Sequence, residues 1–108
     1  MKIFYFLFIF GFSILLSSCA KEPDVEQIKG DLIGQHCKLG GSGYWTFESL
    51  SEFDNFVILN RIKNNDILEY NIDMSLRDGS SIYNIIANVV YRKEGQDWKL
   101  VSVKGKRK

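Results

Sequence analysis

The feature that most constrains the fold is a strictly alternating segment, Ile67 to Arg77, in the second half of the chain. Apolar side chains occupy positions 68, 70, 72, 74 and 76, and polar side chains occupy positions 69, 71, 73, 75 and 77. A period of two is typical of a β-strand with one buried and one solvated face. The segment therefore predicts an antiparallel sheet that packs one face on a core.

Neighbouring segments extend this sheet in both directions. Residues 56–62 predict a strand before it, and residues 82–92 and 98–103 predict two strands after it, with polar turns between them. The segment 82–92 is apolar on both faces, which is typical of a central strand. A short aromatic strand at 44–47 comes first, and Ser49 to Glu52 has the spacing of a capping box that begins one helical turn.

One helix is expected, from Asp24 to about Gln35. Val25, Ile28 and Leu32 recur at helical spacing, and Asp24 is suited to cap the first turn. The predicted fold class is α+β, with one N-terminal helix packed on a curved antiparallel sheet of four to five strands.

The chain begins with a different pattern, a basic Lys2 followed by an apolar run from 3 to 16. A run of this length suits a secretory signal and falls short of the roughly 20 residues that span a bilayer. It ends in Leu16-Ser17-Ser18-Cys19, which resembles the bacterial lipobox, an aliphatic residue and two small residues before a cysteine. A plain secretory signal or an uncleaved anchor is the competing interpretation.

The lipobox resemblance implies a bacterial lipoprotein that is cleaved before Cys19 and carries diacylglycerol on the Cys19 thiol, with acylation of the new amino group. Several acyl chains anchor a protein far more firmly than one. The next residue is Ala20 rather than Asp, which by resemblance to enterobacterial sorting favours the outer membrane over the inner one. The leaflet stays open.

These features divide the chain into a signal peptide at 1–18, a tether at 19–23, a single α+β domain at 24–103 and a basic tail at 104–108. Removing 18 of the 108 residues leaves 90, enough for one domain. A lipidated Cys19 leaves Cys37 alone, so no internal disulfide is expected. The tail is expected to be a solubilising end, and contact with anionic head groups is the alternative.

The order of elements closes with Trp98-Lys99-Leu100 and resembles the cystatin-like and nuclear transport factor 2-like group of small α+β domains. The resemblance implies a helix lying on a curved sheet. Two departures limit it. The single helix, where larger members have three, argues against a deep enclosed pocket. The Gln-x-Val-x-Gly segment of cystatins is absent, which leaves protease inhibition without residues to carry it.

The expected function is a non-catalytic binding or protein-interaction module of the cell envelope. Tyr44 and Trp45 are the candidate interaction surface because aromatic side chains dominate interface energetics, while core packing at the sheet edge is the competing interpretation. The alternative function is a small enzyme or small-ligand-binding domain on the concave face of the sheet. Its polar candidates are Glu69, Asn71 and Asp73.

No cofactor, metal site, catalytic residue or nucleic-acid partner is expected. His36 and Cys37 are adjacent, but a metal site needs three or four convergent ligands and this sequence has one His. We expect a partly buried Cys37 beside a surface His36. The expected partners are the membrane, through the lipid on Cys19, and an envelope protein or a small ligand.

Overall fold

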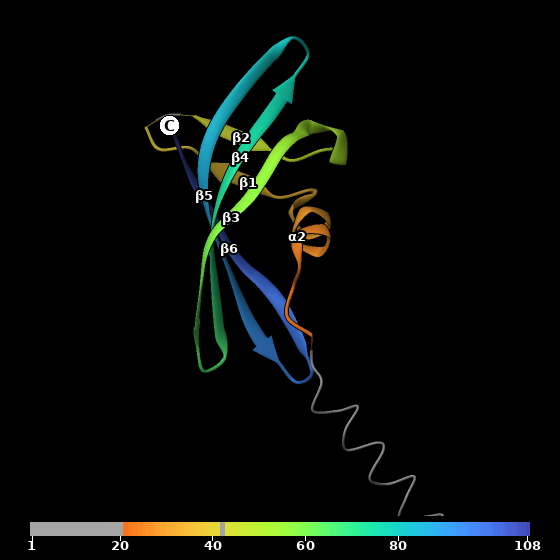
Figure 1. The fold of residues 1–108 in the computed structure, drawn as a ribbon, viewed down its shortest axis with the longest axis vertical. Coiled ribbons are helices and arrows are strands. Elements are labelled where there is room, and N and C mark those ends of the chain that lie inside the picture. Colours follow the sequence, from red (N-terminus) through yellow and green to blue (C-terminus); the bar gives the residue numbers. More distant parts are fainter. Residues whose placement is uncertain (1–20, 42) are drawn as a thin grey trace, which may run out of the picture.

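The computed structural model describes residues 21–41 and 43–108, so the predicted signal peptide and Cys19 lie outside the described residues. Within this part the elements follow one another as shown in Figure 1. They are α2 (Val25–Leu32), β1 (His36–Lys38), β2 (Tyr44–Thr46), the 3₁₀ turn η1 (Leu50–Glu52), β3 (Phe53–Asn64), β4 (Ile67–Asp78), β5 (Ser81–Glu94) and β6 (Asp97–Arg107). No helix of the described part is long and apolar enough to cross a membrane.

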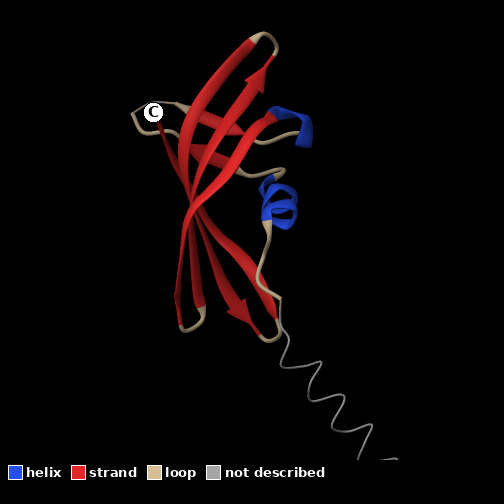
Figure 2. Ribbon diagram, viewed as in Figure 1, coloured by secondary structure: helices blue, strands red, loops and turns tan. Residues whose placement is uncertain are grey.

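All strands of the described part belong to one sheet in the order β2-β1-β6-β5-β4-β3. The long strands β3 to β6 form an antiparallel meander, and the β1–β2 hairpin joins it through β6. Figure 2 shows this twisted sheet with α2 against one side. The prediction of one helix packed on such a sheet is confirmed for the described part.

The expected strand number was wrong, because the described residues form six strands rather than four to five. The additional strand is β1, which has three residues and is too short to show a period of two. One strand pair is also parallel, since Lys38 of β1 is aligned with Lys104 of β6 in the same direction.

The alternating segment behaves as its pattern predicts. From Leu68 to Leu76 of β4, every second side chain is buried and the intervening ones are half-buried. The tight turns that join the long strands contain Asn65, Gly79 and Gly95, all with positive φ. Asn and Gly tolerate this left-handed conformation better than other residues, so the polar turns close the meander as expected.

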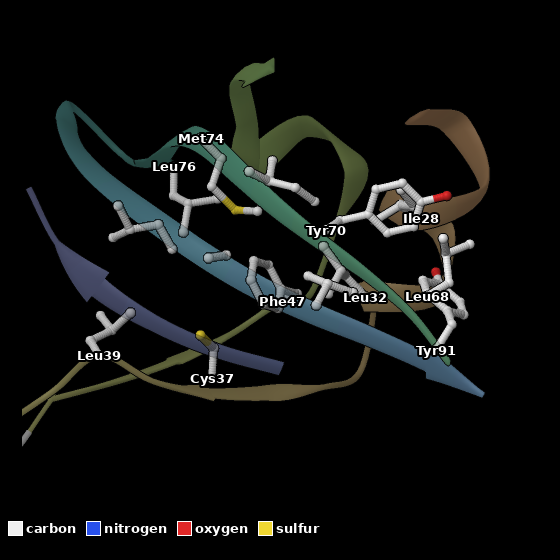
Figure 3. Packing of buried hydrophobic residues seen from close by; sticks show 14 of the residues in the cluster. Ile28, Leu32, Cys37, Leu39, Phe47, Leu68, Tyr70, Met74, Leu76 and Tyr91 are labelled. Atoms are coloured by element: carbon white, nitrogen blue, oxygen red, sulfur yellow. The ribbon is translucent and has the colours of Figure 1, made fainter. Parts of the chain in front are cut away.

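The core lies between α2 and the sheet (Figure 3). Asp24 caps the helix by accepting a hydrogen bond from the Gln27 amide at 2.9 Å, and Ile28 and Leu32 are completely buried. Tyr91 of β5 donates to Asp31 Oδ2 at 2.8 Å. A helix of eight residues is marginal alone, so packing on the sheet stabilises it.

The structure differs from the sequence-based boundaries at both ends of the domain. Residues 104–107 continue β6 and are aligned with residues 85–88 of β5, so they are part of the sheet rather than a tail. Their lysines interrupt the apolar alternation, which is why the strand prediction stopped at 103. The expected tether is also partly packed, because Pro23 is buried and Glu22 pairs with Arg61 and Lys63.

Candidate functional site

Residues 97–103 of β6 form a strand edge that is unpaired on one side within the described part of the chain. β5 is paired with β6 from Asp97 to Arg107, whereas β1 is aligned with it only at Lys104. Within the described part, residues 97–103 therefore have no ladder partner on the side away from β5. The free N–H and C=O groups of such an edge are a template for another extended chain.

Two hollows adjoin this edge. The lower one, of about 520 Å³, lies between α2 and the start of β6, and the upper one, of about 460 Å³, lies between the β1–β2 hairpin and the middle of β6. Both are lined by Gln35 and Leu100, so they adjoin each other, and we call them together the β6 groove. Its lining residues are Lys21, Gln27, Asp31, Gln35, His36, Lys38, Tyr44 and residues 96–104.

The β6 groove carries more basic than acidic side chains. The cations are Lys21, Lys38, Lys99 and Lys104, and the anions are Asp31 and Asp97. One anion, Asp31, already accepts a hydrogen bond from Tyr91. A groove of this charge attracts an acidic ligand in preference to a basic one.

Trp98, which lines the lower hollow, carries a buried hydrogen-bond donor. Trp98 is 7 % exposed, and its indole Nε1 is buried without a hydrogen-bond partner among the described residues. Buried polar groups without a partner are rare in folded proteins. Because protein atoms cover Nε1, it is not available to a ligand in the lower hollow.

The two residues of the predicted interaction surface, Tyr44 and Trp45, differ in exposure but border one hollow together. Tyr44 is 67 % exposed and lines the β6 groove. Trp45, its neighbour on β2, points to the opposite face. Its Nε1 donates a hydrogen bond to Glu52 Oε1 at 3.1 Å, and its ring centroid lies 5.6 Å from that of Tyr83. Tyr44 and Trp45 both border a second hollow, of about 420 Å³, which Arg77 also lines.

The most exposed apolar side chain of the β6 edge, Val101, was not singled out from the sequence. It is 47 % exposed and lies at a register shift between β5 and β6. Nothing in the sequence distinguishes it from the half-buried Val103 of the same segment, because the register shift at Val101 is not visible in the sequence.

The polar candidates of the enzyme alternative lie on the face of the sheet away from α2. Asn88 Nδ2 donates to Glu69 Oε2 at 2.5 Å and to Asn71 Oδ1 at 3.0 Å. Lys108 Nζ pairs with Asp73 Oδ2 at 2.6 Å. A hollow of about 220 Å³ lies beside this network, and the enzyme alternative stays a prediction.

The adjacent His36 and Cys37 lie on opposite faces of β1. His36 is exposed and its Nδ1 lies 2.7 Å from Thr46 Oγ1, whereas Cys37 is completely buried. In the part of the chain that the structure describes, no group of three or more His, Cys, Asp and Glu side chains is placed to hold a metal ion.

Burial raises the pKa of the Cys37 thiol to about 11. We therefore expect Cys37 in the folded protein not to react with a chromogenic disulfide reagent at pH 8, and to react at once in denaturant. Between about pH 8.5 and 11 the unfolded thiol loses a proton that the folded thiol keeps, so the free energy of unfolding should fall as the pH rises. Denaturant titrations at pH 7, 9 and 10.5 measure this, and unchanged stability would contradict it.

No protein-family model matches the sequence, and a search of curated proteins finds no match. Among solved structures, a five-substitution variant titled Rd1NTF2_05 is similar with a TM-score of 0.49 and 12 % identity, covering 88 % of this chain and 95 % of that chain. The α+β class rests on the helix and sheet described above, and the finer resemblance to the nuclear transport factor 2-like group remains a prediction.

Proposed function

We propose that this chain is a lipid-anchored protein of the bacterial cell envelope that binds an extended, acidic segment of an envelope partner along the β6 groove. The observation that carries the proposal is the unpaired stretch 97–103 of β6, flanked by two adjoining hollows. An added strand gains affinity from main-chain hydrogen bonds and specificity from pockets that receive its side chains.

The dimensions of the edge suit this mode of binding. Residues 97–103 span about 23 Å as an extended strand, which is long enough for a segment of about seven residues. Val101 and Tyr44 offer apolar contact, and Lys99 and Lys104 offer cations beside it. The segment is therefore expected to alternate apolar and acidic side chains.

The other two edges of the sheet suit strand addition less well. β2 has only three residues. β3 has twelve, but register shifts at Asp54 and Leu59 interrupt it, and Arg61 and Lys63 lie near its end. Bulges and charged side chains are the common means by which proteins protect an edge strand from pairing.

The proposed anchor is the lipid on Cys19. Replacing Cys19 by alanine is expected to abolish incorporation of a palmitate analogue and to move the protein from the membrane fraction to the soluble fraction. The physical reason is that each buried methylene of an acyl chain contributes about 0.8 kcal/mol to membrane binding. Ser18→Ala keeps a small residue before the cysteine and serves as the matched control. Labelling of Cys19→Ala at the level of the control would contradict the anchor.

The groove is tested by a photo-reactive amino acid at Val101 and, separately, at Val57, in intact cells. Both side chains are 47 % exposed, but Val101 borders the β6 groove and Val57 lies on β3. We expect a specific adduct from position 101 alone, cross-linked to an extended acidic segment of the partner. Adducts of equal yield from both positions would contradict the proposal.

A synthetic peptide of the cross-linked segment then tests strand addition directly. The peptide should slow amide hydrogen exchange in residues 97–103 of β6. Val101→Asp should weaken its binding at least tenfold, about 1.4 kcal/mol, through like-charge repulsion. Val57→Asp makes the same chemical change elsewhere and should leave binding unchanged. Protection confined to the polar face around Asn71 would instead favour the small-ligand alternative.

A further inference from the structure

The short segment before α2 is fastened to the sheet. The Glu22 carboxylate pairs with Arg61, and Lys63 Nζ lies 2.9 Å from its Oε2. The hydrogen bond from Lys63 and the charge of Arg61 hold the pKa of Glu22 below its usual range, so the carboxylate is charged at neutral pH. Pro23 is buried, and its carbonyl accepts a hydrogen bond from Tyr70 Oη at 2.7 Å. The chain is therefore held on β3 and β4 before the helix begins.

These contacts place the start of the described chain at one end of the sheet. Arg61 and Lys63 precede the β3–β4 turn, and Lys21 borders the lower hollow together with Gln96 of the β5–β6 turn. Figure 1 shows the orange segment entering beside this end, with the β4–β5 turn at the other end. The two ends are separated by β5, whose 14 residues extend about 45 Å.

Cys19 lies only two residues before Lys21, so their Cα atoms are at most about 8 Å apart. A lipid on Cys19 therefore starts close to the end that holds the β3–β4 and β5–β6 turns. This end is more basic than acidic, which suits anionic head groups. Its cations are Lys21, Arg61, Lys63, Arg92, Lys93 and Lys99, and its anions are Glu22, Asp66, Glu69, Glu94 and Asp97, so the excess is one positive charge.

We infer that the fastened segment 21–24 orients the domain on an anionic lipid surface, with the β3–β4 and β5–β6 turns facing the head groups and the β4–β5 turn facing away. The inference rests on the proposed lipid at Cys19. On this inference, the contacts of Glu22 and Pro23 with the sheet set the orientation of the domain. The lysines of 104–108 lie in the half of β6 that leads away from the β3–β4 and β5–β6 turns, so they do not contact the head groups.

The test uses the full chain, processed in bacteria and reconstituted into vesicles of phosphatidylglycerol and phosphatidylethanolamine. A fluorescent thiol label is placed at Gln96→Cys or at Ser80→Cys. Both are exposed turn residues that follow a glycine, and the buried Cys37 is protected from the reagent. Lipids with a nitroxide on the head group should quench the label at 96 strongly and leave the label at 80 unquenched. Equal quenching, or stronger quenching at 80, overturns the orientation.

A second comparison tests the fastening itself. Glu22→Ala removes the carboxylate that pairs with Arg61 and Lys63, and Lys104→Ala removes a charge on the far half of β6. In Glu22→Ala the difference in quenching between positions 96 and 80 should shrink, whereas in Lys104→Ala it should persist. An unchanged difference in Glu22→Ala shows that the carboxylate does not orient the domain. Thermal melts of both variants check that the fold is retained.

The mass of the N-terminal peptide separates failure of the anchor from failure of the orientation. An acylated Cys19 with equal quenching at both positions overturns the orientation alone. A peptide without acyl groups, from protein that does not remain with the vesicles, overturns the proposed anchor and the orientation with it.

Discussion

Replacing Phe47 by alanine is expected to lower the free energy of unfolding by about 3–5 kcal/mol, because the change leaves a cavity in the core. Phe47 is completely buried, and its ring stacks on that of Phe53 with the two ring centroids 5.6 Å apart. Its backbone also bonds to Gly34 and Gln35, at 2.6 and 3.1 Å, and so fastens the end of α2 to the residue after β2. Urea unfolding followed by tryptophan fluorescence measures the loss.

The matched control for this change is Tyr44→Ala, which removes an aromatic ring of similar size from a site 67 % exposed. Surface substitutions of this kind usually change stability by at most about 0.5 kcal/mol. A comparable loss in both variants would contradict the assignment of Phe47 to the core and of Tyr44 to the β6 groove. The same Tyr44→Ala protein, being folded, can then be used to measure binding of the cross-linked segment.

Replacing Gly105 by alanine is expected to lower the free energy of unfolding by about 1–3 kcal/mol through overpacking. A Cβ atom on Gly105 would lie 3.0 Å from Cys37 Sγ and 3.4 Å from Leu39 Cδ2. β1 packs against β6 at this point, so the new methyl group would push the β1–β2 hairpin away from the meander. Thermal and urea unfolding measure the loss.

Two further variants show whether the clash is the cause. Gly30→Ala adds the same methyl group inside α2, where no atom outside the helix backbone lies within 4 Å, and should raise stability by roughly 0.5–1 kcal/mol. Cys37→Ala removes the nearest clashing atom. If the clash with Sγ is responsible, the double variant Cys37→Ala, Gly105→Ala should be more stable than the sum of the two single changes predicts. Strict additivity would contradict this explanation.

The two proposals fit together in space. The β6 groove begins beside Gln96 and Asp97, at the end of the sheet that we place on the lipid surface, and continues along β6 to Lys104. A partner segment bound there would therefore run away from the membrane along the strand. If the orientation fails while the cross-link at Val101 is found, the groove still stands, because its geometry does not involve Cys19.

The long strands were predictable because their signal is local. Every second residue of β4 is buried, and the sequence shows this alternation without knowledge of the partner strands. The cap at Asp24 and the capping box from Ser49 to Glu52 were predictable for the same reason, since each involves residues three apart. The chemistry expected at Cys19 also depends only on its neighbours in sequence, although it lies outside the described residues.

The candidate site was only partly predictable. Tyr44 was expected at an interaction surface as an aromatic residue beside a glycine-rich loop, and it lines the β6 groove. Trp45 was paired with it by adjacency. The two side chains point to opposite faces of the strand and Trp45 packs partly against the core, yet both border the hollow beside Arg77, so their joint role stays a prediction. Val101 carries no sequence signal of its role, because whether a residue lies at a free strand edge depends on which other strands pair beside it.

What the sequence by itself determined is the class of the domain, one capped helix and a two-sided antiparallel meander, since helical and strand periods are properties of consecutive residues. Only the tertiary structure decided that the strand after Asp97 continues through Arg107, that Lys38 meets Lys104, and that the chain before α2 is fastened to the sheet. Each of these depends on contacts between residues distant in the chain, 66 positions apart for Lys38 and Lys104 and 41 for Glu22 and Lys63. No local pattern specifies such contacts, and both the free edge of β6 and the orientation of the domain follow from them.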